Sequence, residues 1–244
     1  MIYTAILFDM DGVVIDTHEA VTQFWLALGT EHGVQLSQAN FQQHIYGCPM
    51  NHTFDVLFPH LSSEQRRAIF VRLEEYEIAA TYTAIPGVIA LLQTLRWRGI
   101  PTALVTSADT WKVDVVERQL ELQGLFTTRV TIGEIKRGKP HPDGYLLAAR
   151  RLQQPPPRCL VFEDAISGVQ AAVAAGTTCI GLRPPETAQA LLDAGASHII
   201  PDFTGVTLSD MPPNGHPASL WLQLGAELGL PLWRLDASRG DFNL

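Results

Sequence analysis

The sequence predicts an α/β protein: a doubly wound parallel sheet with an inserted, all-helical segment. Short apolar runs rich in β-branched residues recur along the chain, as in strands buried on both faces, and helical patterns separate them. These two observations predict the sheet. A third observation predicts the insertion, because the stretch 17–84 contains no convincing strand. The alternation stops directly after the first apolar run and resumes at Pro86-Gly87.

The expected elements follow one another in a regular order. The first strand lies within residues 2–8, and further strands are expected at 101–107, 127–132, 159–163, 177–182 and 197–201. Helical patterns separate the later strands, at 87–98, 109–121, 143–152, 165–175 and 186–194. Several of these helices stop at a glycine, such as Gly99 or Gly176, which is typical of helix C-termini. Within the insertion, helices are expected near 18–31, 37–45, 50–58 and 62–81.

Length and composition indicate an ordinary globular protein. The 244 residues are 46% hydrophobic and 17% charged, and a chain of this length can bury a core without disulfides. The net charge of −8 and the lack of a long basic run argue against nucleic acid as a partner. The 3 cysteines contain no C-x-x-C pair, so reduced thiols in a cytoplasmic protein are expected. The N-terminus lacks signal-peptide features and no apolar run reaches about 18 residues, so no membrane association is expected.

The interruption divides the chain into parts. We expect a sheet domain formed by 1–16 and 85–207, with a helical cap, 17–84, inserted between them. The last stretch, 208–244, is an extension of uncertain structure and begins with a linker-like run. Its tryptophans and many leucines are too apolar for a disordered tail, so we expect it to pack on the chain's own core. A surface for a partner or a second copy is the alternative, and a monomer and a homodimer both stay open.

Two carboxylates follow the first expected strand. Asp9 and Asp11 stand in "LFDMDGVVIDT", where the apolar run ends. Ligands of doubly wound sheets bind beyond the carboxyl ends of the strands, so this is a position for chemistry. The pair could be turn residues, a dyad that shares a proton, or a magnesium site with a nucleophilic aspartate. An EF-hand is excluded, because Val14 and Ala20 occupy its glycine and glutamate positions.

Other strand ends carry the partners that a metal-assisted site needs. Thr106 and Ser107 follow the second expected strand and offer a hydroxyl and backbone N–H groups. Lys139 precedes a helix, and Glu163 and Asp164 stand at the end of a later strand. Each of these could instead cap a helix or be solvated. Because all of them stand at strand ends of one sheet, together they favour a functional site.

These motifs make the chain similar to a known family. The four motifs of the haloacid dehalogenase (HAD) superfamily are matched, in order and spacing, by "DMDGVVIDT", "VTSA", "GKPHPDGY" and "FEDAISGVQAAVAAG". Over residues 1 to about 207 the chain resembles the helical-cap branch, which contains β-phosphoglucomutase-like and phosphoglycolate phosphatase-like enzymes. The resemblance implies a Rossmann-like HAD core, a helical cap and phosphoryl transfer with Mg²⁺.

The resemblance also implies the chemistry of the carboxylates. Asp9 would be the nucleophile that forms an aspartyl phosphate, and Asp11 would be the general acid–base. The carboxylates of Asp9 and Asp164 and the backbone carbonyl of Asp11 would hold Mg²⁺, which prefers oxygen ligands. Glu163 would bind the ion directly or through water.

A second group of matching residues would bind the phosphate. The Thr106 hydroxyl and the Ser107 N–H would grip the phosphoryl oxygens, and Lys139 would offset the charge between Asp9 and the phosphate. The cation and the lysine would then balance the paired carboxylates, which explains why like charges can stand together where a buried strand ends.

Residue types narrow the reaction. A dehalogenase lacks the second aspartate that Asp11 supplies, and a phosphonoacetaldehyde hydrolase uses a cap lysine, which 17–84 lacks. β-Phosphoglucomutases carry a histidine and an arginine where this chain has Val21 and Met50. The departures favour a Mg²⁺-dependent phosphatase of a small phosphorylated metabolite, with sugar phosphates among the candidates, over a sugar phosphomutase. A non-catalytic regulatory or binding protein with this fold is the third hypothesis.

The cap is the part expected to read the substrate, and its sequence does not name that substrate. Asn51 and His52 flank the expected substrate loop and are the candidate substrate ligands. Arg66 and Arg67 lie early in a helix of mixed charge and are expected to be solvated.

Overall fold

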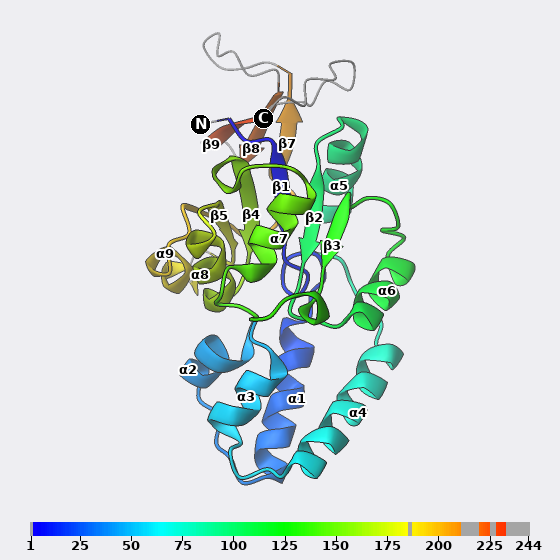
Figure 1. The fold of residues 1–244 in the computed structure, drawn as a ribbon, viewed down its shortest axis with the longest axis vertical. Coiled ribbons are helices and arrows are strands. Elements are labelled where there is room, and N and C mark those ends of the chain that lie inside the picture. The colour runs from blue at the N-terminus through cyan, green and yellow to red at the C-terminus, as the bar shows by residue number, and fades with distance from the viewer. Residues whose placement is uncertain (1, 185–186, 211–219, 225–227, 233–244) are drawn as a thin grey trace.

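A parallel sheet forms the centre of the protein. The structure is a computed structural model, and it describes residues 2–184, 187–210, 220–224 and 228–232. The six-stranded sheet has the order β3-β2-β1-β4-β5-β6, with β1 paired to both β2 and β4 (Figure 1). Its strands are β1 Ala5–Phe8, β2 Thr102–Val105, β3 Thr128–Val130, β4 Cys159–Glu163, β5 Thr178–Leu182 and β6 His198–Ile200. Each lies within the range that its apolar run predicts.

Helices cover both faces of this sheet. Side chains alternate along a strand, so Ile6 and Phe8 of β1 join the core on one face and Ala5 and Leu7 join the core on the other. The first core is closed by α5 (Val88–Trp97) and α6 (Thr110–Gln119). The second core is closed by α7 (Asp143–Arg151), α8 (Ile166–Ala174) and α9 (Gln189–Asp193). The predicted doubly wound α/β fold is confirmed.

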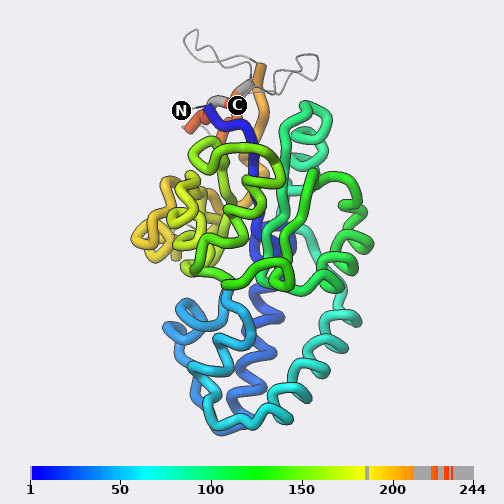
Figure 2. Tube along the Cα trace, in the orientation of Figure 1, coloured from blue at the N-terminus to red at the C-terminus, as the bar shows by residue number. Residues whose placement is uncertain are grey.

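The helical insertion lies between β1 and β2. Its helices are α1 His18–Glu31, α2 Gln38–Asn40, α3 Met50–Leu57 and α4 Ser63–Ala79. They enclose a core of their own around Trp25, Leu28, Phe54 and Phe58. Figure 2 shows the chain leaving the sheet after β1, tracing the insertion at one end of the molecule, and returning before α5. The insertion therefore forms a cap beyond the carboxyl end of β1.

One cap helix changes its winding. The pattern at 37–45 predicts one helix, whereas the structure has α2 followed by a π-helical turn, Phe41–Ile45. The Ser37 hydroxyl accepts a hydrogen bond from the Asn40 N–H and starts α2 with a capping box. Phe41 and Ile45, at the two ends of this wider turn, are both buried in the cap core.

The C-terminal part adds a small antiparallel sheet. Its strands are β7 Val206–Ser209, β8 Leu220–Leu224 and β9 Leu228–Leu232, in the order β7-β8-β9. Leu222, Leu224 and Leu232 are buried in the same core as Phe8 of β1. The described part of the extension thus packs on the chain's own core, and β7 begins before the boundary predicted at 207. Most of the linker-like run and Trp233 lie outside the described residues, and the division into domains stays a prediction.

Among the helices described, none is long and apolar enough to cross a membrane.

Candidate active site

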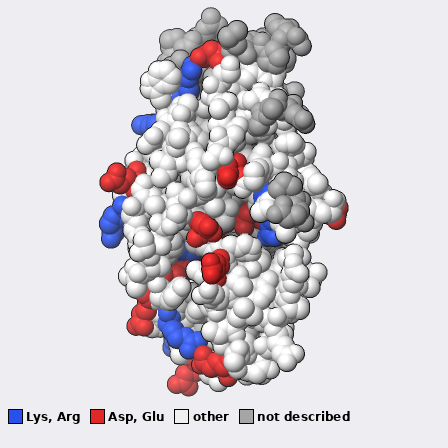
Figure 3. Space-filling model, turned by 180° about the vertical axis from the view of Figure 1, so that it is seen from behind, with Lys and Arg blue, Asp and Glu red and all other residues white. Residues whose placement is uncertain are grey.

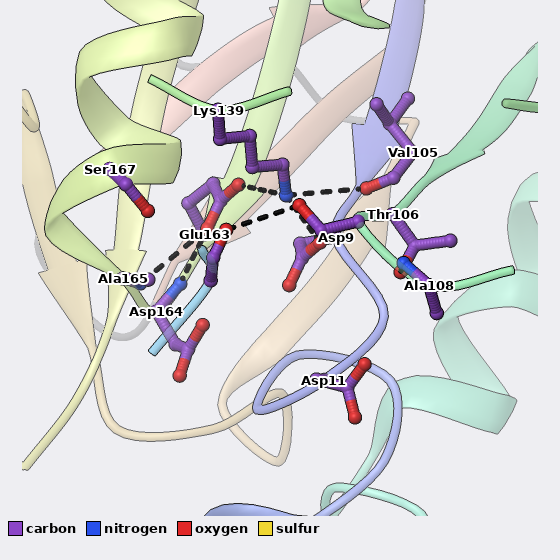
Figure 4. A network of polar contacts seen from close by, with 12 residues as sticks. Asp9, Asp11, Val105, Thr106, Ala108, Lys139, Glu163, Asp164, Ala165 and Ser167 are labelled. Carbon is purple, nitrogen blue, oxygen red and sulfur yellow. Dashed lines mark hydrogen bonds and ion pairs between the residues drawn. The ribbon is translucent and has the colours of Figure 1, made fainter. Parts of the chain in front are cut away.

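The sheet order brings the predicted site residues together. Because β1 lies between β2 and β4, Asp9 after β1 faces Thr106 after β2 and Glu163 at the end of β4. Lys139 enters from the loop that precedes α7, and Asp164 follows Glu163. Figure 4 shows these side chains converging, with Lys139 reaching in between Asp9 and Glu163. Residues from four separate strand–helix connections therefore share one site.

Lys139 is buried among carboxylates. Its Nζ donates a hydrogen bond to Asp9 Oδ1, lies 2.6 Å from Glu163 Oε1 and lies 3.4 Å from the Val105 carbonyl oxygen. Burial by itself would lower the pKa of Lys139, but the carboxylates of Asp9 and Glu163 raise it above the usual value. Burial raises the pKa of Asp9, and the charge of Lys139 opposes that rise. Lys139 is thus a fixed positive charge beside the carboxylate predicted to be the nucleophile.

Glu163 holds Lys139 in place. Its Oε1 accepts the hydrogen bond from the Tyr145 hydroxyl in addition to contacting Lys139, and its Oε2 accepts the N–H groups of Asp164 and Ala165 at 3.2 and 3.5 Å. A Cβ added to Gly168 of α8 would lie 2.0 Å from Glu163 Oε1, so the helix can approach this carboxylate only with glycine there. Both oxygens of Glu163 are therefore engaged within the protein.

A cluster of carboxylates fits a cation. Oxygens of Asp9, Glu163 and Asp164 all lie within 4.8 Å of one another, and all-oxygen donors suit a hard divalent ion. Burial, reinforced by the charge of Glu163, raises the pKa of Asp164 to about 7, while Arg183 and Lys139 oppose the rise. Gly12 has φ +77°, and a Cβ there would lie 2.1 Å from Asp164 Oδ2. The loop after β1 thus approaches Asp164 closely. A positive charge among these crowded carboxylates would stabilise their ionised forms.

Asp11 has different partners. Its Oδ1 accepts hydrogen bonds from the Thr17 hydroxyl and from Lys112 Nζ, both at 2.9 Å. Lys112 lies on α6 and is buried, and its Nζ also lies 2.7 Å from Glu77 Oε1 on the cap helix α4. Although burial opposes it, Asp11 and Glu77 raise the pKa of Lys112, so its charge is secured. One lysine therefore joins Asp11, the sheet domain and the cap.

The residues predicted to grip phosphate lie after β2. The Thr106 hydroxyl oxygen accepts a hydrogen bond from the Ala108 N–H at 3.0 Å, which curls the chain into a turn. The Ser107 hydroxyl donates a hydrogen bond to the Gly47 carbonyl oxygen at 3.1 Å, so the Ser107 side chain links the loop after β2 to the cap. The group of Ser107 that the family resemblance assigns to phosphate is its backbone N–H, and this role stays a prediction.

A cavity of about 260 Å³ lies between cap and sheet. Asp9, Asp11, Thr106, Ser107 and Asp164 line it from the sheet side, and helices α1 and α4 line it from the cap. Within the described chain Lys139 and Glu163 are not part of the lining and lie behind it. The predicted site therefore opens into a space that can hold a small molecule.

The two candidate substrate ligands of the cap lie elsewhere. Asn51 and His52 are exposed and do not belong to the described lining of the cavity. The His52 ring instead contacts His44, with 3.2 Å between Nε2 and Nδ1. The substrate role predicted for these two residues gains no support from the geometry.

The structure also adds residues that the motifs alone did not single out. Tyr145 stands inside the matched stretch "GKPHPDGY", so its position was visible in the sequence although its partner Glu163 was not. Lys112 and Glu77 carry no motif signal, because the Lys112–Asp11 contact joins residues 101 positions apart. Only the packing of α6 against the cap brings them to the site.

Comparisons with known proteins point to one family. The family model described as haloacid dehalogenase-like hydrolase matches residues 3–176. Hexitol phosphatase A of Escherichia coli is 37% identical over 183 residues, which are 73% of this chain and 82% of the relative. The phosphorylated carbohydrates phosphatase of Thermotoga maritima is 30% identical over 202 residues, 80% of this chain and 93% of the relative. The solved structure of a HAD hydrolase of family IA, variant 3, from Entamoeba histolytica matches with a TM-score of 0.71 at 28% identity, covering 83% of this chain and 95% of that one.

Proposed function

The chain belongs to the haloacid dehalogenase-like hydrolases and is a phosphomonoester phosphatase, and on that premise we propose that it hydrolyses a small phosphorylated metabolite through a phosphoenzyme on Asp9. The observation that carries the proposal is the buried contact of Lys139 with Asp9 and Glu163, beside Asp164 and at the wall of a cavity. A fixed cation next to a buried carboxylate is what a phosphoryl-transfer site needs to bring two negative groups together.

In the first half-reaction Asp9 is the nucleophile. Lys139 holds Asp9 Oδ1, so we assign the attack on phosphorus to Oδ2. As the new O–P bond forms, the bond from phosphorus to the leaving oxygen breaks, and the electron pair of that bond stays with the leaving oxygen. Asp11, held at Oδ1 by Thr17 and Lys112, gives that oxygen a proton. The products are an alcohol and an aspartyl phosphate.

In the second half-reaction water is the acceptor. The Asp11 carboxylate takes a proton from a water molecule, whose oxygen attacks phosphorus, and the Asp9–phosphorus bond breaks. Inorganic phosphate leaves, and both aspartates return to their starting states. Thr106 and the Ser107 N–H would hold the phosphoryl oxygens during both transfers, since both line the cavity beside Asp9.

We propose Mg²⁺ as the cofactor. The Asp9 and Asp164 carboxylates and the Asp11 carbonyl would hold the ion. Both carboxylate oxygens of Glu163 already accept hydrogen bonds from the protein. When bound, Mg²⁺ supplies positive charge that offsets the carboxylates and the phosphoryl group. Lys139 supplies the rest from the buried side.

The substrate class proposed is a sugar phosphate or a sugar-alcohol phosphate. Two relatives are named for hexitol and for phosphorylated carbohydrates, and the cavity of about 260 Å³ lies just below the roughly 300 Å³ at which sites for drug-sized ligands begin. A sugar phosphate would fit the space between α1, α4 and the aspartates.

The test is release of inorganic phosphate from p-nitrophenyl phosphate and from a panel of sugar phosphates. We expect hydrolysis with Mg²⁺, loss of hydrolysis in EDTA and recovery when Mg²⁺ is returned. Full activity in EDTA would refute the metal role of Asp9 and Asp164. A second assay uses β-glucose 1-phosphate with a trace of the bisphosphate. If glucose 6-phosphate forms faster than phosphate is released, the protein is a mutase and the proposed phosphatase function is wrong.

A further inference from the structure

The cap side of the cavity is largely apolar. Helix α1 contributes Val21 and Phe24, α3 begins there with Met50, and α4 contributes Phe70. Trp111 of α6 adds an aromatic surface from the sheet domain. Surfaces of this kind bury C–H groups and aromatic faces rather than charges. The part of a substrate that lies beyond its phosphate therefore meets an apolar wall.

The charged groups in the lining outside the metal site are mostly carboxylates. Asp11, Glu74, Glu77 and Asp109 all line the cavity. In the described part of the lining, Lys112 is the one lysine or arginine, and it is already paired with Asp11 at 2.9 Å and with Glu77 at 2.7 Å. Figure 3 shows several acidic side chains at mid-height on one face of the molecule, with basic side chains close to them. A second anionic group on the substrate would meet negative charge here.

The neighbouring basic residues His18 and Arg183 do not add a free positive charge to the described lining of the cavity. His18 lines the cavity, but burial and the nearby Arg183 lower the pKa of His18, which favours its uncharged form. Arg183 donates from Nε to the Asp164 carbonyl oxygen at 2.9 Å and lies over the Tyr46 ring, outside the lining.

Two cap arginines pair with acids away from the cavity. Arg66 bonds Asp55, and Arg72 bonds Glu31 at 2.9 Å. Their guanidinium groups therefore do not supply the charge that the lining lacks.

Resting on the proposed function, we propose that the substrate is a phosphomonoester whose phosphate is its only anionic group, carried on an uncharged leaving group with an apolar face. The phosphate would lie against Thr106 and the metal site, with Lys139 behind Asp9, while the rest of the substrate would lie against the apolar wall. A second phosphate or a carboxylate on the substrate would lose its hydration on binding and would find no unpaired cation in the described lining to compensate. The lining carboxylates would also repel it. The geometry thus selects against bisphosphates and phosphorylated acids.

The test compares matched pairs that differ in one anionic group. One pair is glucitol 6-phosphate with 6-phosphogluconate, another is fructose 6-phosphate with fructose 1,6-bisphosphate, and a third is phenyl phosphate with 4-carboxyphenyl phosphate. Each compound is measured as a competitor of p-nitrophenyl phosphate with Mg²⁺ present, so that its inhibition constant is obtained whether or not it is hydrolysed. We expect the member with one anionic group to bind at least about tenfold more tightly in at least two pairs, as expected for a loss of one charge-assisted contact.

Equal constants within the pairs, including no inhibition by either member, would overturn the inference, as would tighter binding of the doubly anionic members. The last result would point to Arg183 as the second anchor. Failure of the proposed function is a separate outcome, because it would show as no hydrolysis of p-nitrophenyl phosphate itself.

A gain-of-charge variant tests whether the charge of the lining causes the discrimination against doubly anionic compounds. Met50→Arg places a cation in the lining and is expected to reduce the discrimination against fructose 1,6-bisphosphate at least about tenfold. Met50→Gln, of similar size but uncharged, is the matched control and should leave the discrimination as in the wild type. If both variants discriminate as the wild type does, the charge of the lining is not what selects the substrate.

Discussion

At the scale of single residues, the site is a balance of buried charges. Asp9 is 3% exposed, Lys139 7% and Glu163 0%, so water screens none of them well. Lys139 contacts both carboxylates, and Glu163 is fixed by Tyr145 and two backbone N–H groups. Removing Lys139 would leave both carboxylates buried without their partner, which is more costly than losing an exposed ion pair.

Asp9→Asn should remove nearly all activity and leave the fold intact. An amide of the same shape neither attacks phosphorus nor binds Mg²⁺ well, and the loss of a covalent nucleophile typically lowers turnover by several orders of magnitude. The measurement is kcat with p-nitrophenyl phosphate, alongside circular dichroism. Asp16→Asn, at an exposed position of the same loop, is the matched control. A folded Asp9→Asn protein that keeps a tenth of wild-type turnover would rule out Asp9 as the nucleophile.

Asp164 predicts a pH dependence of stability without metal. Burial raises the pKa of Asp164 to about 7, above the usual value of about 3.9. Between these pH values the folded protein binds this proton more tightly than the unfolded chain does. The resulting stabilisation is present at low pH and is lost as the pH rises through 7.

The measurement is the unfolding midpoint in EDTA from pH 5 to pH 8. The wild type is expected to lose more stability over this range than Asp164→Asn, and Mg²⁺ should restore the wild type at pH 8 by binding the ionised carboxylate. Identical pH profiles for the two proteins would show that Asp164 ionises normally in the folded state.

At the scale of elements, α6 connects the chemistry to the cap. Lys112 of α6 binds Asp11 in the loop after β1 and Glu77 of α4 in the cap. Burial raises the pKa of Glu77, against the opposing charge of Lys112, so this carboxylate depends on its partner to stay ionised. One ammonium group thus contacts both the cap and Asp11, the proposed general acid–base.

Lys112→Met should lower kcat by about tenfold or more, because Asp11 keeps only its Thr17 hydrogen bond and loses a charge-assisted one. Glu77→Gln removes the charge on the cap side and leaves the Lys112–Asp11 contact, so its loss of kcat should be smaller. Lys136→Met, at an exposed position, is the matched control. Wild-type kcat in Lys112→Met would show that Asp11 needs no positioning by this lysine.

At the scale of the whole molecule, the C-terminal strands complete the core. Leu222 of β8 is 0% exposed and belongs to the cluster that includes Phe8, Phe162 and Phe203. Phe8 itself directly precedes Asp9 at the end of β1. The β7–β9 sheet therefore supports, from one face, the strand that precedes Asp9, the proposed nucleophile.

Leu222→Ala should destabilise the protein by about 2–5 kcal/mol, because it removes buried methyl groups and leaves a cavity. For a chain of this size each kcal/mol lowers the unfolding midpoint by roughly 2–4 °C, so calorimetry can measure the change. Leu192→Ala, at a side chain 40% exposed, is the control and should change the midpoint little. A Leu222→Ala midpoint equal to that of the control would show that the extension is dispensable for the core.

Much of this protein is determined by the sequence alone. Strands and helices follow from the periodicity of neighbouring apolar residues, and the predicted ranges of β1 to β6 and of the cap helices agree with the structure, except that 37–45 is a short α-helix followed by a π-helical turn. The grouping of Asp9, Thr106, Lys139, Glu163 and Asp164 was also predictable. Parallel strands end at one edge of a sheet, so Asp9, Thr106, Glu163 and Asp164, at or directly after strand ends, are expected to lie close together there. Lys139 comes from the loop before α7, and its place in the group was implied by the family resemblance.

What only the tertiary structure decided concerns contacts between elements. The joining of Asp11, Lys112 and Glu77 depends on how α6 packs against the cap, and no local pattern encodes a contact between residues 101 positions apart. The same packing leaves Asn51 and His52 outside the described cavity lining and places Met50, Phe70 and Trp111 within it. Periodicity tells which face of a helix is apolar, but the side chains that meet across two packed helices depend on the crossing of the helices, and that crossing is set by the core as a whole.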